Sequence, residues 1–214
     1  MARPENLKGV LFDFDGTLAD TEILGFELDQ AVAAQYGIRL DEQDLRSLIG
    51  TTGLESVPAM FARHGVEITY PEFEARRQRN DVIYKERLQG LVPGAKKVLD
   101  DLVAHGIRLA LVSTTDTYEI VYACNRFGIT SHFDAFVGGD MDLVGKPAPD
   151  PYLTALGFLG LKPEECIVVE DSPTGIAAGK AAGMHTIAFT GGSVVQDVSA
   201  ADETFASYEE LSLI

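Results

Sequence analysis

Two aspartates one residue apart, Asp13 and Asp15, follow the apolar run 9–12 and precede a Gly-Thr step. A short apolar run that ends at a turn signal predicts a buried strand. Both carboxylates are therefore expected at the strand's carboxyl end, the edge where open α/β sheets bind ligands. Neighbouring carboxylates repel each other unless a cation or a shared proton intervenes, and oxygen ligands suit a hard cation such as Mg²⁺. The pair predicts a metal-assisted reaction centre.

Two simpler interpretations of this aspartate pair exist. An Asp-Gly step is also typical of a hairpin turn, and an Asp-x-Asp sequence can open a calcium loop. A calcium loop requires an acidic residue or Asn two places after Asp15, then Gly, then a closing Glu. Thr17, Leu18 and Leu24 stand at those places, which disfavours calcium. These residues alone do not decide between a hairpin turn and a reaction centre.

Polar residues with complementary chemistry follow later apolar runs. Each has an ordinary explanation when taken singly, as a helix cap or a solvated charge. Together they supply hydroxyl groups, an ammonium group and a second acidic pair, which are the parts of a site for phosphoryl transfer. These groups are the hydroxyl run Ser113, Thr114 and Thr115, the loop cation Lys146, and the acidic pair Glu170 and Asp171.

The elements that must position these groups alternate from residue 91 onward. Strand patterns followed by helix patterns predict a parallel sheet with crossover helices, an α/β fold. We expect the parallel sheet to bring all the polar groups to one edge. The predicted helices are 93–105, 117–127, 149–159 and 172–182, and the predicted strands are 107–112, 134–137, 166–169, 185–189 and 203–205.

The segment between the first strand and residue 90 has a different character, being charged and helical. Leu24, Leu28, Val32 and Tyr36 recur at helical spacing, and further helices are expected over 41–49, 54–64 and 71–88. We predict a helical cap domain at 20–89 and a core domain formed by 1–19 and 90–214. A helical insertion directly after a catalytic strand is well placed to act as a lid. Arg76 and Arg77 are expected on its surface, as helix arginines usually are.

Composition limits the possible partners. The 214 residues carry a formal net charge of −16, which argues against nucleic acid and anionic membranes as partners. No apolar run reaches the length of a membrane span, and the first residues lack the apolar region of a signal peptide. We expect a soluble cytoplasmic protein, a monomer or weak dimer, whose partner is a small phosphorylated molecule.

The ordered set of motifs resembles the haloacid dehalogenase-like hydrolase superfamily. The resemblance is to the subfamily with a helical cap after the first core strand, which includes β-phosphoglucomutase and phosphoglycolate phosphatase-like enzymes. It implies a Rossmann-like α/β core. The motifs are Asp13-Phe14-Asp15-Gly16-Thr17, Ser113, Lys146 within Lys-Pro-x-Pro-Asp, and Glu170-Asp171-Ser172-Pro173-Thr174-Gly175-Ile176.

The resemblance implies a role for each motif residue. Asp13 would be the nucleophile that accepts the phosphoryl group as an aspartyl phosphate, and Asp15 the general acid and base. Mg²⁺ would be held by the Asp13 carboxylate, the Asp15 carbonyl and Asp171, with Glu170 close by. The resemblance further assigns the phosphoryl oxygens to the Ser113 hydroxyl, the Thr114 amide and the Lys146 ammonium group.

Departures from the family pattern narrow the activity. The mutase branch carries a His early in the first cap helix and an Arg in a loop between cap helices, where this chain has Gly25 and Gly53. This favours a Mg²⁺-dependent phosphatase of a sugar phosphate or a phosphorylated carboxylic acid. A sugar-phosphate mutase and a non-catalytic regulatory protein are the alternatives, and the intact motif set argues against the second. In the cap, Thr51, Thr52, Arg79 and Asn80 are predicted to contact the leaving group.

Overall fold

The computed structural model describes residues 2–48, 53–194 and 196–213, without the side chain of Arg46. Its centre is a six-stranded sheet of order β3-β2-β1-β4-β5-β6, in which every neighbouring pair is parallel. The predicted α/β fold is thus confirmed. The strands are β1 (Gly9–Phe12), β2 (Arg108–Val112), β3 (Ala135–Val137), β4 (Cys166–Glu170), β5 (His185–Phe189) and β6 (Glu203–Phe205).

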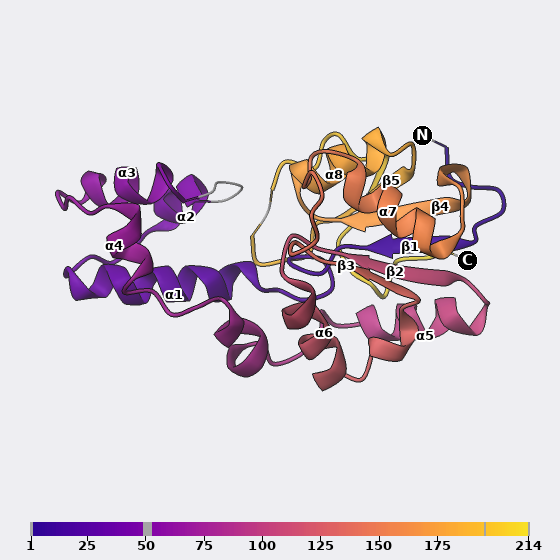
Figure 1. Ribbon diagram of the computed structural model, residues 1–214, viewed down its shortest axis with the longest axis horizontal. Helices are drawn as coiled ribbons and strands as arrows, with labels where there is room; N and C mark the ends of the chain where they lie inside the picture. Colours follow the sequence, from indigo (N-terminus) through magenta and orange to yellow (C-terminus); the bar gives the residue numbers. More distant parts are fainter. Residues whose placement is uncertain (1, 49–52, 195, 214) are drawn as a thin grey trace.

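Helices cover both faces of this sheet (Figure 1). Successive strand residues point to opposite faces, so Val10 and Phe12 pack in one cluster with residues of α5 and α6, while Leu11 packs in another with residues of α7 and α8. Both faces are therefore apolar, and the polar groups are left at the strand ends. The core helices are α5 (Ala95–Ala104), α6 (Thr117–Arg126), α7 (Asp150–Leu159) and α8 (Pro173–Ala181), with short 3-10 turns at η2 (Thr130–His132) and η3 (Pro163–Glu165).

A helical lobe lies beside the sheet, at the end opposite the two chain termini (Figure 1). Most of its buried side chains form a cluster of their own, which includes Val32, Phe61 and Phe73. The residue ranges of this lobe agree with a cap at 20–89, a boundary that we retain as a proposal. Its elements are α1 (Glu22–Gln35), α2 (Glu42–Leu48), α3 (Ser56–Arg63), α4 (Tyr70–Glu74) and the π-helical turn η1 (Ile83–Arg87).

The predicted continuous helix over 71–88 is wrong. Helix α4 ends at Glu74, and η1 begins only at Ile83. Between them the Arg77 guanidinium donates to the Gln78 carbonyl at 3.3 Å and to Asn80 Oδ1 at 2.6 Å. The Gln78 carbonyl thus accepts from a side chain within this break. Within the described residues, no helix is both long and apolar enough to cross a membrane.

Candidate active site

The polar groups that follow β1, β2 and β4 meet at one edge of the sheet. Strand β1 pairs with β2 on one side and β4 on the other. Asp13 continues this pairing, because its amide donates to the Val169 carbonyl at 2.9 Å. Asp13, Ser113 and Asp171 are all buried. Parallel strands thus bring together residues that are up to 158 positions apart in the sequence.

Lys146 lies in a loop before α7 and bonds to groups at the ends of three strands at this edge. Its side chain is only 4% exposed, and its ammonium group donates to Asp13 Oδ1 and Glu170 Oε1 at 2.6 Å each, and to the Val112 carbonyl at 3.0 Å. Burial alone would lower the pKa of Lys146, but the charges of Asp13 and Glu170 outweigh it and raise that pKa. Lys146 is therefore a permanent cation that offsets two carboxylates.

Glu170 is fully buried and both its oxygens are occupied. Oε1 also accepts from the Tyr152 hydroxyl at 2.8 Å, and Oε2 accepts from the Asp171 amide at 3.1 Å and from Ser172. Ser172 in turn caps α8, since its Oγ accepts from the Gly175 amide at 3.0 Å. Glu170 therefore fixes the loop that carries Asp171.

The carboxylates here fit a hard divalent cation. One oxygen each of Asp13, Glu170 and Asp171 lies within 4.8 Å of the others, and all three side chains are buried. Burial raises the pKa of Asp13 well above its ordinary value, and burial with the Glu170 charge raises that of Asp171 to about 8. Such crowded carboxylates are unfavourable as anions unless a cation offsets them. An all-oxygen donor set is the kind that Mg²⁺ prefers.

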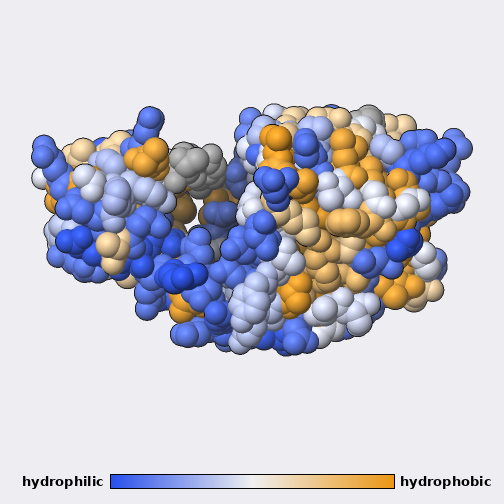
Figure 2. Space-filling model, viewed as in Figure 1, coloured by the Kyte–Doolittle hydropathy of each residue, from blue (hydrophilic) through white to orange (hydrophobic). Residues whose placement is uncertain are grey.

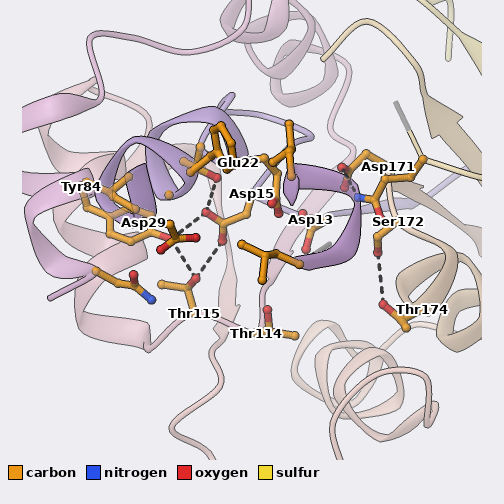
Figure 3. Close-up of a pocket in the computed structure, with 18 of the residues that line it drawn as sticks. Asp13, Asp15, Glu22, Asp29, Tyr84, Thr114, Thr115, Asp171, Ser172 and Thr174 are labelled. Carbon is orange, nitrogen blue, oxygen red and sulfur yellow. Dashed lines mark hydrogen bonds between the residues drawn. The ribbon is translucent and has the colours of Figure 1, made fainter. Parts of the chain in front are cut away.

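Asp15 is held in a separate network of hydroxyl groups, part of which Figure 3 shows. Oδ1 accepts from Thr21 at 2.8 Å and from Tyr84 at 2.7 Å, whereas Oδ2 accepts from Ser113 at 3.0 Å and from Thr115 at 2.9 Å. Asp13 and Asp15 are thus divided between two environments, one ammonium-bonded and one hydroxyl-bonded.

Tyr84 connects this network to the helical lobe. It belongs to η1, and burial followed by the nearby Asp15 charge raises its pKa well above the ordinary value. The phenol is therefore neutral and able to donate to Asp15. The sequence reasoning missed Tyr84, because an aromatic residue in a predicted helix usually signals a core position, and Tyr84 is indeed buried.

A cleft of about 460 Å³ opens between the sheet edge and the helical lobe, where Figure 2 shows the surface hollowed. Asp13, Asp15 and Lys146 lie on its sheet side. A second cleft, of about 580 Å³, adjoins it. Both share Asn80 and Thr114, two of the residues predicted to contact the substrate.

The cap residues predicted from the sequence fall in different places. Arg79 lines the second cleft but not the first. Thr51 and Thr52 lie outside the described residues. The expectation that Arg77 is a surface charge is wrong, since its side chain is 14% exposed and lines both clefts. Its Nε donates to Asp29 Oδ1 at 2.5 Å, and this pairing with α1 has no signal in the local sequence.

Several other residues that line the first cleft were not singled out by their sequence pattern. They are polar residues on predicted helices or after strand ends, and only the fold brings them to the site. These residues are Thr21, Glu22, Asp29 and Gln196.

Comparison with known proteins agrees with this geometry. Residues 10–189, which are most of the chain, match the family model described as haloacid dehalogenase-like hydrolase. The chain belongs to this family. Among haloacid dehalogenase-like relatives, the phosphorylated carbohydrates phosphatase of Thermotoga maritima is 33% identical over 85% of this chain and 84% of its own length. The β-phosphoglucomutase of Bacillus subtilis is 31% identical over 85% of this chain and 82% of its own length.

The fold of the family is also shared. The crystal structure of CbbY from Rhodobacter sphaeroides in complex with phosphate superposes with a TM-score of 0.76, at 30% identity, over 96% of each chain. The predicted family is therefore confirmed by both sequence and fold.

Proposed function

We propose that this protein is a Mg²⁺-dependent phosphatase that hydrolyses small phosphomonoesters through an aspartyl phosphate on Asp13. The observation that carries the proposal is the meeting of Asp13, Asp15, Lys146 and the Glu170-Asp171 pair at one sheet edge. The phosphorylated carbohydrates phosphatase among the relatives named above supports the same class of reaction.

Asp13 is suited to attack phosphorus. Lys146 donates to its Oδ1, and among the described residues no hydrogen-bond donor reaches its Oδ2. This leaves one oxygen for the attack, while Lys146 offsets the charge that gathers on the phosphoryl group. The Ser113 hydroxyl and the Thr114 amide would hold further phosphoryl oxygens. Ser113 must then give up its bond to Asp15.

Asp15 is suited to move the proton. It would protonate the leaving oxygen and then remove a proton from the water that cleaves the aspartyl phosphate. The hydroxyl groups of Thr21 and Tyr84 orient this carboxylate by donating hydrogen bonds to its Oδ1. Asp13, Asp171 and the Asp15 carbonyl, with Glu170 close by, would hold Mg²⁺. The ion would offset repulsion between the attacking carboxylate and the phosphoryl group.

Hydrolysis is favoured over a mutase reaction by two glycines. Gly25 lines the first cleft and Gly53 the second, at the places where the mutase branch has a His and an Arg. Neither glycine offers a side chain to hold a second phosphate, so water is the expected acceptor.

The test is phosphate release from a panel of phosphomonoesters with Mg²⁺, after chelation, and after Mg²⁺ is restored. We expect activity to disappear with the chelator and return with the ion. Asp13→Asn should abolish turnover and the acid-stable label left by radiolabelled substrate, whereas Asp142→Asn, an exposed control, should retain both. Full activity of Asp13→Asn would contradict the mechanism. Conversion of β-glucose 1-phosphate to glucose 6-phosphate that depends on a bisphosphate primer would favour the mutase instead.

A further inference from the structure

The wall of the first cleft that faces the catalytic carboxylates is itself acidic. Glu22, Gly25 and Asp29 recur on one face of α1, and all three line the cleft. Figure 3 draws Glu22 and Asp29 with the catalytic aspartates. Two carboxylates of the cap thus approach the space that a leaving group must occupy.

The two cations in the described lining of the first cleft, Arg77 and Lys146, are already engaged. Arg77 lies over Gly25, where its NH2 is 3.9 Å from the position that a Cβ on Gly25 would take. Its nitrogens donate to Asp29, Asn80, Gln78 and the Gly25 carbonyl. Lys146 is bonded to Asp13 and Glu170. Both cations in the described lining of the first cleft thus already have carboxylate partners, and a second anionic group on the substrate would have to compete for them.

The balance of charge is negative in both clefts. In the described lining of the first, Lys146 and Arg77 oppose five carboxylates, which are Asp13, Asp15, Glu22, Asp29 and Asp171. In that of the second, Arg77 and Arg79 oppose four, which are Asp29, Glu74, Asp116 and Glu119. Mg²⁺ and the phosphoryl group carry opposite charges, so binding both of them would leave the net charge of the first cleft almost unchanged. A leaving group that carries its own carboxylate would meet like charge on the cap side.

The same side chains are good partners for hydroxyl groups. A carboxylate accepts several hydrogen bonds, the Asn80 amide both donates and accepts, and the Thr115 hydroxyl does the same. An alcohol with several hydroxyl groups can satisfy them without burying a new charge.

We propose that the leaving group is an uncharged polyhydroxy alcohol, and that Glu22 and Asp29 select against phosphorylated carboxylic acids. This inference rests on the proposed phosphatase function and narrows it to the sugar and sugar-alcohol class. In this proposal, specificity comes from repulsion between the carboxylates of Glu22 and Asp29 and the carboxylate of an acid substrate. Proteins commonly use such unfavourable contacts to discriminate between similar ligands.

Two matched pairs of phosphomonoesters test the proposal, each differing only by a hydroxymethyl group against a carboxylate. They are glycerol 1-phosphate with 3-phosphoglycerate, and glucitol 6-phosphate with 6-phosphogluconate. We expect kcat/KM of the Mg²⁺-loaded enzyme to favour the alcohol of each pair by about tenfold or more.

Variants of the acidic wall separate specificity from folding. Asp29→Asn should release Arg77 and reduce the preference mainly by lowering KM for the acids. Glu22→Gln should act in the same direction without touching the Arg77 pair. Asp81→Asn removes a carboxylate that is paired with Lys85 outside the lining of both clefts, and it should leave the preference as it is.

The outcomes distinguish this inference from the proposed function. Equal or faster hydrolysis of both acids, or an unchanged preference in both Asp29→Asn and Glu22→Gln, would overturn the inference while the phosphatase function stands. Absence of hydrolysis across the whole panel would overturn the proposed function, and the inference with it.

Discussion

Replacement of Lys146 by Met should destabilise the protein strongly. The substitution keeps a long apolar side chain near the Tyr152 ring, which now lies 5.1 Å from the ammonium nitrogen, but removes that ammonium. Asp13 and Glu170 would stay buried without their shared cation. Breaking a buried ion pair by removing one partner costs about 3–5 kcal/mol. For a chain of this size that is a fall in Tm of about 6–20 °C.

Urea unfolding at pH 7 with a chelator present measures this loss, because bound metal would otherwise replace part of the lost charge. Lys85→Met is the matched control. Lys85 is also 2.8 Å from a carboxylate, that of Asp81, but both side chains are about a third exposed. An exposed pair contributes about 1 kcal/mol or less.

The effect of Lys146→Met should also depend on pH. The pKa of Asp13 is raised even with Lys146 present. Without the ammonium group, Asp13 should take up a proton more readily, so the loss of stability should shrink as the pH falls from 7 to 5. An equal loss in the Lys146→Met and Lys85→Met proteins at pH 7 would refute the view that Lys146 compensates buried charge.

Three further predictions follow from the site. Tyr84→Phe should lower kcat in the phosphate-release assay about tenfold, since a hydrogen bond to a charged group contributes about 1.5–3 kcal/mol, whereas exposed Tyr118→Phe should match wild type. In metal-free protein the raised pKa of Asp171, about 8, stabilises the fold at low pH, and this contribution is lost as pH rises through 8. Mg²⁺ must displace that proton, so Mg²⁺ should raise Tm more at pH 8.5 than at pH 6, and an equal rise would count against a metal site there. Ser172→Ala should cost about 1–2 kcal/mol in urea unfolding through loss of the α8 cap, against at most about 0.5 kcal/mol for exposed Ser131→Ala, and equal costs would contradict the capping role.

The core of the site was predictable because its residues follow strands. The run before Asp13 and the run before Asp171 are apolar and end at polar residues, and both became neighbouring strands, β1 and β4. A parallel arrangement then brings their carboxyl ends to one edge, whatever the connecting segments do. The family motifs could be placed in space for the same reason.

The helical lobe was less predictable because its interactions join distant segments. Arg77 meets Asp29 across 48 residues, and Tyr84 meets Asp15 across 69. Neither pairing can be recognised from the spacing of residues in the sequence. The break in the predicted helix 71–88 lies in the same segment, where Arg77 contacts Asp29 on α1, and the helical spacing of 71–88 gives no sign of that contact.

The sequence by itself thus determined the family, the α/β fold and the order of the motifs, because strand ends and turn residues are set by near neighbours in the chain. Only the tertiary structure decided which groups hold Asp15 and which charges line the leaving-group side. Those depend on how the helical lobe, with α1 and η1, is placed beside the sheet edge (Figure 1). That folding buries Arg77 against Asp29, and with Glu22 it leaves the cleft opposite Asp13 and Asp15 acidic.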